Sequence, residues 1–187
     1  PDIFLANDVS PNSLFHNSGR GKFDEVGLTA GVAVDINGMA NGNMGVDSAD
    51  YNNSGLLSFY VTSYQNQFSI LYKNLGRGRF DDVTLTSGAG NGTFPYVTWG
   101  CGFVDLDNDG QRDLFVVCGQ IQENVDRYDD TTSYRCRNIV LWNLNNGKFV
   151  NVTDQCGEAL QQRHSGRGVA FADLDNDGRM DVVILNS

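Results

Sequence analysis

The sequence predicts an all-β protein, a β-propeller of four-stranded blades, of which this chain holds three repeat periods. Two observations lead to this fold class. An aspartate-rich loop between apolar strands occurs twice with the same spacing, and a weaker copy precedes it. Short apolar runs alternate with Gly, Asn and Asp turns, and no stretch has convincing helical periodicity. Four-strand repeats of about 40 to 60 residues are typical of propeller blades.

Composition limits the class of protein. The chain has 187 residues, 40% hydrophobic and 11% aromatic, which is enough for a real core. No segment approaches the roughly 20 apolar residues of a membrane helix. The formal net charge of -10, without a Lys/Arg cluster, argues against a nucleic-acid surface and favours a metal as the partner of the acidity. The chain opens inside a strand, so we expect part of a longer protein, with any export signal upstream.

The strands of one period follow a fixed order. Each aspartate loop leads into an apolar strand, then an aromatic-apolar strand, a glycine turn, a strand of the GKFDEVG type, and a last apolar strand into the next loop. The strands that follow the loops are spaced 56, 55 and 68 residues apart, and they begin at Asp2, Ser58, Asp113 and Asp181.

We therefore expect one partial propeller domain over residues 1–187, with repeats at 2–57, 58–112 and 113–181. Propellers typically close with 4 to 8 blades, and open sheet edges invite pairing. Missing blades or self-assembly are expected to complete the fold. The third period is longer because of a polar insertion at 118–138, which is either a recognition segment or a tolerated surface loop.

The loop DLDNDGQRD at 105–113 and its copy DLDNDGRMD at 173–181 have the spacing of a calcium site. Alternate carboxylates turn toward a shared cation, and glycine takes the sharp turn. Crowded all-oxygen ligation suits calcium better than magnesium. The expected ligands are Asp105, Asp107, Asp109, Asp113 and the carbonyl of Gln111, and, in the second loop, Asp173, Asp175, Asp177, Asp181 and the carbonyl of Arg179.

These loops are not EF-hands, because position 12 is Val116 or Ile184 instead of glutamate and the flanks are strands. An alternative is that the aspartates only form Asx turns, but two complete copies in register favour metal. A third, degenerate loop keeps the glycine and a single carboxylate, so weaker binding or none is expected there. Its ligand positions hold Asp50, Asn52, Ser54, Leu56 and Ser58.

The repeated DLDNDG loop, the LFHN and LYKN strands and the GRGRFDDVT turn resemble the FG-GAP or VCBS-type repeat of integrin α-chain propellers. The segments PYVTWGCGFVDLDNDGQRDLFVV and SGRGVAFADLDNDGRMDVVILN are similar to the cartilage acidic protein-like, or ASPIC/UnbV, family. This resemblance covers essentially the whole chain. It implies an extracellular, cell-surface or periplasmic, seven-bladed propeller with structural calcium.

The resemblance also implies a role in adhesion or in binding a protein or glycan. The alternative is a propeller domain of an exported carbohydrate-active enzyme, a lyase or hydrolase. The sequence has no G-x-S-x-G, HExxH or P-loop motif, so an enzyme is the less favoured class. His16 and His164 are interpreted as surface or packing residues.

Four cysteines lack the paired spacing of a zinc site: Cys101, Cys118, Cys136 and Cys156. In an exported protein Cys118 and Cys136 could staple the insertion as a disulfide, while buried free thiols are the alternative. The strand aromatics are expected in the core between blades in preference to a sugar-stacking platform. They are Tyr72, Trp99, Phe103, Trp142 and Phe171.

Overall fold

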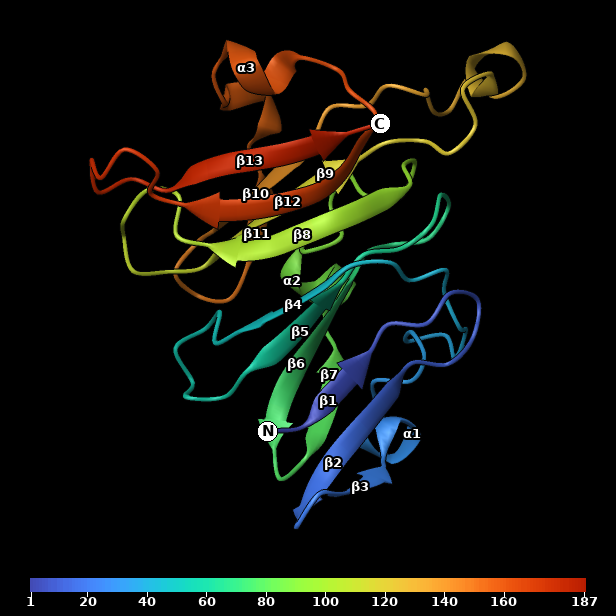
Figure 1. The fold of residues 1–187 in the computed structure, drawn as a ribbon, viewed down its shortest axis with the longest axis vertical. Coiled ribbons are helices and arrows are strands. Elements are labelled where there is room, and N and C mark those ends of the chain that lie inside the picture. The colour runs from blue at the N-terminus through green and yellow to red at the C-terminus, as the bar shows by residue number, and fades with distance from the viewer.

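The computed structural model describes residues 1–187, which form four antiparallel sheets (Figure 1). In each sheet the strands pair in chain order, so that every strand forms a hairpin with the next. The first sheet contains β1 (Ile3–Leu5), β2 (Ser13–Gly19) and β3 (Lys22–Glu25), followed by α1 (Gly27–Ala30). The second contains β4 (Val46–Ala49), β5 (Ser58–Val61), β6 (Ile70–Gly76) and β7 (Arg79–Asp82), followed by α2 (Thr84–Ser87).

The third sheet is also complete, and the fourth has two strands. The third contains β8 (Thr98–Val104), β9 (Asp113–Cys118), η1 (Val125–Arg127), β10 (Ile139–Asn143) and β11 (Phe149–Asn151), then η2 (Thr153–Gln155) and α3 (Glu158–Gln161). The fourth contains β12 (Gly166–Ala172) and β13 (Asp181–Asn186). The structure is a partial β-propeller, as predicted.

The three sequence periods are distributed over four sheets, because the periods from Ser58 and Asp113 start at the second strand of a sheet, β5 and β9. Every sheet after the first takes its opening strand, β4, β8 or β12, from the end of the preceding period. The sequence period and the folded blade are therefore offset by one strand.

The opening strands of neighbouring sheets pack side by side, β4 against β8 and β8 against β12 (Figure 1). Small residues permit this approach. A Cβ on Gly45 would lie 2.1 Å from the carbonyl oxygen of Trp99, and a Cβ on Gly102 would lie 2.2 Å from the ring of Phe171. The glycines in the MGVD and WGCGFVD segments therefore set the spacing between blades.

Apolar side chains alternate between two interfaces along the central strand β9. Leu114 and Val116 are in the cluster shared with the second sheet, whereas Phe115 and Val117 are in the cluster that contacts the fourth. All four side chains are at most 1% exposed. A strand that is buried on both faces reads as a continuous apolar run, which explains the segment LFVV.

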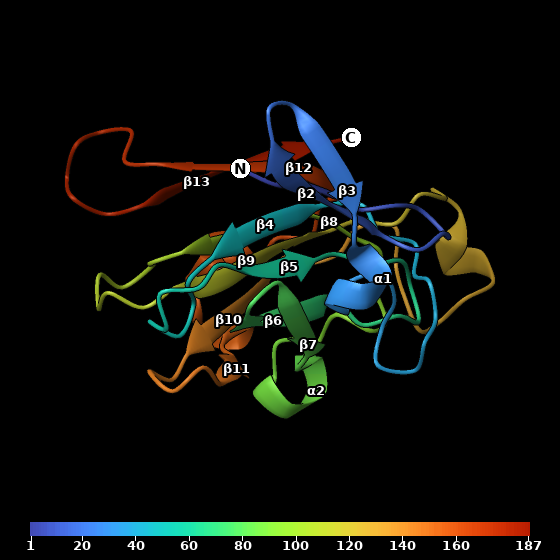
Figure 2. The ribbon, with the colours of Figure 1, turned by 90° about the horizontal axis from the view of Figure 1, so that it is seen from below.

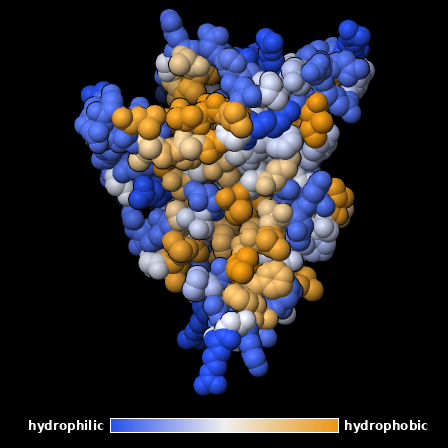
Figure 3. All heavy atoms as spheres, in the orientation of Figure 1, coloured by the Kyte–Doolittle hydropathy of each residue, from blue (hydrophilic) through white to orange (hydrophobic).

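The outer sheets expose the faces that the inner sheets bury. Val183 and Leu185 on β13 are 51% and 70% exposed, and Ile3 and Leu5 on β1 are each 46% exposed. Figure 3 shows apolar side chains gathered over β12 and β13 and continuing downward across the molecule. Each end of the partial propeller thus presents apolar side chains that an inner blade would cover.

The helices are single turns that the sequence pattern did not predict. The turns α1 and α2 follow the last strand of a sheet, and each ends at a glycine with positive φ, 85° at Gly31 and 81° at Gly88. Four residues are too few to produce helical periodicity. None of the helices has the length and apolar character needed to cross a membrane.

All four cysteines are free thiols, so the alternative of a bridge between Cys118 and Cys136 is wrong for this structure. Both of these side chains are buried in the apolar cluster between the second and third sheets. Burial raises the pKa of Cys136 to about 11 and also raises the pKa of Cys118. The thiols are therefore protonated packing groups at neutral pH.

The aromatic residues expected in the core divide into two groups. Tyr72 and Phe103 are buried, and Phe171 packs against the cluster of the third sheet. Trp99 is partly buried, with the guanidinium carbon of Arg167 4.4 Å from its ring centroid. Trp142 is 37% exposed, which corrects the prediction of a core position. It lies between Leu141 and Asn143, whose side chains take the buried positions of β10.

Candidate metal centre

Three aspartate loops lie on the same side of the molecule. Each joins the first and second strands of a sheet: 50–58 joins β4 to β5, 105–113 joins β8 to β9, and 173–181 joins β12 to β13. Figures 1 and 2 show all three on the left, with the insertion at 118–138 on the opposite side. The repeat thus places equivalent loops in a row across neighbouring blades.

The first complete loop is folded by its own carboxylates. Asp105 accepts hydrogen bonds from the backbone N–H groups of Asp109, at 3.1 Å, and Gly110, at 3.0 Å. Asp107 accepts a bond of 3.2 Å from the N–H of Asp109. Asn108 and Gly110 have φ values of 60° and 85°, which turn the chain back on itself. The DxDxDG spacing therefore specifies a tight turn with its carboxylates on the inside.

The second complete loop repeats this geometry. Asp173 accepts bonds of 3.1 Å from the N–H of Asp177 and 2.9 Å from that of Gly178. Asp175 accepts a 3.1 Å bond from the N–H of Asp177. The guanidinium of Arg179 lies 3.9 Å from the carboxylate of Asp177, a loose and exposed ion pair.

Three carboxylates in each loop are close enough to share one ion. One oxygen from each lies within 4.8 Å of the others, and the triads are Asp105, Asp107, Asp109 and Asp173, Asp175, Asp177. Calcium–oxygen distances of about 2.3 to 2.6 Å separate ligands on opposite sides of the ion by roughly 5 Å. The donor chemistry and the spread of the oxygens therefore fit a calcium-sized cation.

The closing carboxylates lie outside these triads. Asp113 is 1% exposed and accepts bonds of 3.1 Å from the N–H of Leu106 and 2.8 Å from that of Asn143. Burial raises the pKa of Asp113, although these two bonds oppose the shift. Asp181 accepts a 2.9 Å bond from the N–H of Leu174. Both residues brace the base of their loops.

The remaining expected ligands are backbone carbonyls, of Gln111 and Arg179. Their N–H groups donate to Asp109 at 2.7 Å and Asp177 at 2.8 Å, which fixes the local turn. Ligation through these two carbonyls stays a prediction.

The loop at 50–58 keeps the turn and loses the triad. Asp50 accepts bonds of 2.9 Å from the N–H of Ser54 and 2.6 Å from that of Gly55. Desolvation raises the pKa of Asp50, but these bonds outweigh it, and the pKa is lowered. The side-chain oxygen of Asn52 is buried and has no hydrogen-bond partner. This loop holds its shape with one carboxylate.

A repeated asparagine, for which the sequence predicted no role, anchors the degenerate loop, the first complete loop and the segment before β1. Its amide donates to the backbone carbonyl before the closing residue: Asn17 to Pro1 at 3.2 Å, Asn74 to Leu57 at 2.8 Å and Asn143 to Arg112 at 3.1 Å. The signal was the Asn that ends LFHN, LYKN and LWN. Only pairing of the strands reveals that it contacts a loop.

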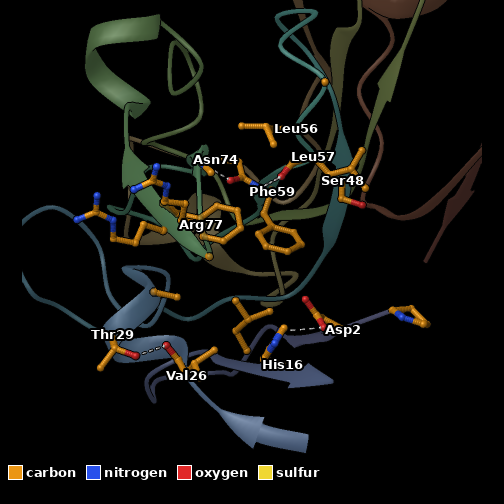
Figure 4. A pocket seen from close by; sticks show the side chains of 18 residues that line it. Asp2, His16, Val26, Thr29, Ser48, Leu56, Leu57, Phe59, Asn74 and Arg77 are labelled. Carbon is orange, nitrogen blue, oxygen red and sulfur yellow. Dashed lines mark hydrogen bonds and ion pairs between the residues drawn. The ribbon is translucent and has the colours of Figure 1, made fainter. Parts of the chain in front are cut away.

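A groove of about 1010 Å³ lies beside the degenerate loop, between the first two sheets (Figure 4). Its lining includes Leu56 and Phe59 on one side and Val26, Thr29 and Ala30, at α1, on the other. His16 is exposed at its edge, with Nδ1 3.3 Å from the carboxylate of Asp2. His164 is also exposed, so both histidines are at the surface, as expected.

The fold and the loops together place this chain in the class of propeller-type repeat proteins with an aspartate-rich hairpin loop in successive blades. A family model described as FG-GAP-like repeat matches residues 50–116 and 124–184, which is more than half of the chain. The chain belongs to this family of FG-GAP-like repeat proteins. The matched segments contain the two complete loops and the degenerate one.

Curated relatives extend this likeness over nearly the whole chain. Over 185 residues, or 98% of the chain, it is 25% identical to cartilage acidic protein 1 of Mus musculus and of Homo sapiens. The corresponding protein of Xenopus tropicalis is 24% identical over the same length. The chain spans about a quarter of the length of these relatives.

Proposed function

We propose that this chain is a calcium-stabilised segment of an extracellular propeller that binds a protein or glycan partner. The observation that carries the calcium part is the pair of carboxylate triads, each within 4.8 Å and each in the same place of its sheet. Calcium would supply two positive charges to each triad. Asp105, Asp107 and Asp109 would hold it in one loop, and the triad that begins at Asp173 in the other.

Cation binding at these loops has a structural consequence. Each loop joins the opening strand of a blade to the next strand, and the opening strands form the contacts between blades. A loop with three close carboxylates carries repulsion that a divalent cation removes. Calcium would therefore stabilise the hairpin at the point where neighbouring blades meet.

The interaction part of the proposal is supported by the family and by the form of the molecule. Propeller repeats present edge segments and loops on a rigid frame, and the 118–138 insertion is the longest such segment between strands of one blade. The similarity to cartilage acidic protein 1 supports an extracellular location. Arrays of glycans and matrix proteins test this part. The binding of the unmodified protein is compared with that of a variant in which a short Gly/Ser linker replaces residues 120–134.

The calcium part is tested by isothermal titration calorimetry of protein that has been stripped with EGTA. We expect two calcium sites per chain, with one site lost in Asp107→Ala and the other in Asp175→Ala. Magnesium at the same concentration is the control for charge alone, and should bind more weakly. The absence of a calcium heat in the unmodified protein, or two sites remaining in both variants, would reject it.

A further inference from the structure

Hydrogen bonds join the aspartate loops of neighbouring blades. The side-chain amide of Asn108, in the first complete loop, donates to the backbone carbonyl of Gly178, in the second, at 2.9 Å. The side-chain amide of Asn53, in the degenerate loop, donates to the side-chain oxygen of Gln111, also at 2.9 Å. The first two loops thus each contact the loop that follows them in the propeller.

Both donors occupy the fourth position of their loop. Asn53, Asn108 and Asn176 have φ values of 55°, 60° and 58°, a left-handed conformation that asparagine tolerates better than most residues. The same backbone geometry directs the amides of Asn53 and Asn108 toward the following loop. Asn176 has the same conformation and makes no hydrogen bond in this structure, so it is a matched residue without the contact.

The acceptors belong to the turn that carries an expected ligand. Gly178 donates its N–H to Asp173 at 2.9 Å and immediately precedes Arg179, whose carbonyl is an expected ligand. The bond from Asn108 therefore restrains the same turn that the second triad requires. Gln111 holds the equivalent ligand position in the loop that Asn53 contacts.

We propose that Asn108 is a positioning residue that couples cation binding at the 105–113 loop to cation binding at the 173–181 loop. This inference rests on the calcium function proposed above. A cation that orders the first loop fixes the donor, and the bond then reduces the conformational freedom that the second loop must lose. Linkage makes the effect reciprocal, so each site should increase the affinity of the other by the same factor.

The size of the coupling is limited by one neutral hydrogen bond near the surface. Such a bond corresponds to at most about a tenfold change in an equilibrium constant. We therefore compare the product of the two calcium binding constants. In the unmodified protein this product should be about three- to tenfold larger than for two independent sites.

Calorimetry of single-site variants tests this coupling. Asp175→Ala reports the first site alone and Asp107→Ala reports the second, and their constants predict the isotherm of independent sites. The unmodified protein should exceed that prediction. Asn108→Gly, which keeps the left-handed turn and removes the amide, should bring the isotherm to the prediction obtained from its own single-site variants. Asn176→Gly should leave the coupling factor unchanged.

The outcomes separate this inference from the proposed function. If the unmodified protein binds no calcium, both are overturned. If two calcium ions bind and Asn108→Gly keeps the same coupling factor as Asn176→Gly, the calcium function stands and the role of Asn108 is wrong. Circular dichroism of each glycine variant in EGTA confirms that any change does not arise from unfolding.

Discussion

The degenerate loop at 50–58 and the complete loop at 105–113 have the same backbone turn and differ in their side-chain charges. In both, the first aspartate accepts bonds from the N–H groups of the fifth and sixth residues, and the fourth residue is an asparagine with positive φ. The complete loop has aspartates at positions 3 and 5, where the degenerate loop has Asn52 and Ser54. Positions 1, 4 and 6 therefore form the turn, whereas positions 3 and 5 give it the charge for a cation.

The closing residue separates the two loops further. Asp113 accepts bonds from the N–H of Leu106 within its own loop and from the N–H of Asn143 on β10. Ser58 keeps only the equivalent of the second bond, from the N–H of Asn74 on β6. The smaller Ser58 is still buried and still ties the loop to its sheet. A blade can thus lose a carboxylate triad and keep the hairpin that the propeller requires.

Replacing the first aspartate should produce the largest effect. Asp105→Ala removes two charge-assisted hydrogen bonds, and we expect a loss of about 3 kcal/mol in the free energy of unfolding in EGTA. Asp50→Ala should lose a similar amount, since it makes the same two bonds. Urea denaturation measures both. Only Asp105→Ala should also lose calcium stabilisation, and an equal loss in Asp50→Ala would contradict the separation of turn and ligands.

The anchoring asparagines should differ in how much they contribute to the free energy of unfolding. The buried amide of Asn143 donates to Arg112 of its own loop and, at 2.7 Å, to the carbonyl of Tyr51 in the degenerate loop. Asn143→Ala leaves both carbonyls without this donor, and we expect a loss of about 2 kcal/mol.

Asn74→Ala is the control for the contact between blades, because the amide nitrogen of Asn74 donates only to Leu57, at the surface, and its oxygen accepts from Gly76 in the same hairpin. Its expected loss is about 0.5 to 1 kcal/mol. Equal losses in the two variants, measured by urea denaturation, would show that the contact between blades adds nothing.

Restoring the missing carboxylates should convert the degenerate loop. The double variant Asn52→Asp with Ser54→Asp completes the triad, and we expect calorimetry to find one additional calcium site. In EGTA the added repulsion should lower the free energy of unfolding by about 1 kcal/mol. The variant Ser54→Asn with Asn52 unchanged controls for size, because asparagine has the size of aspartate without its charge. A stoichiometry that stays the same would show that the loop lacks more than charge.

The smallest effect should come from the cysteines, because no disulfide braces any loop. Burial raises the pKa of Cys136 to about 11, so its thiol is overwhelmingly protonated at pH 8 and should react slowly with Ellman's reagent. The partly buried Cys156 should react before Cys118. After unfolding without reductant, four thiols per chain should react. A count of two would show that a disulfide is present.

The strands and turns could be predicted because their signals are local. Asp50, Asp105 and Asp173 recur with glycine five residues later, and each local turn is closed by bonds within a few residues. The all-β class and the order of strands follow from the same repeats, and the structure confirms both.

The contacts between blades could not be predicted, because they join residues far apart in the sequence. Asn143 and Tyr51 are 92 residues apart, and Asn108 and Gly178 are 70 apart. The exposure of Trp142 depends on which face of β10 the neighbouring sheet covers. The distribution of three periods over four sheets likewise depends on which strands pair, which a period length alone does not determine.

The central claim, that the complete loops are calcium sites that stabilise the propeller, is tested most directly by thermal unfolding. The midpoint is measured in excess EGTA and across a calcium series, for the unmodified protein, Asp107→Ala and Asp175→Ala. Calcium at 100 times its dissociation constant adds about 2.7 kcal/mol per site, which for a chain of this size raises the midpoint by about 5 to 10 °C. We predict that the midpoint rises with calcium and that each variant loses part of the rise. A midpoint that is the same in EGTA and in calcium would contradict the account and leave the aspartates as turn formers.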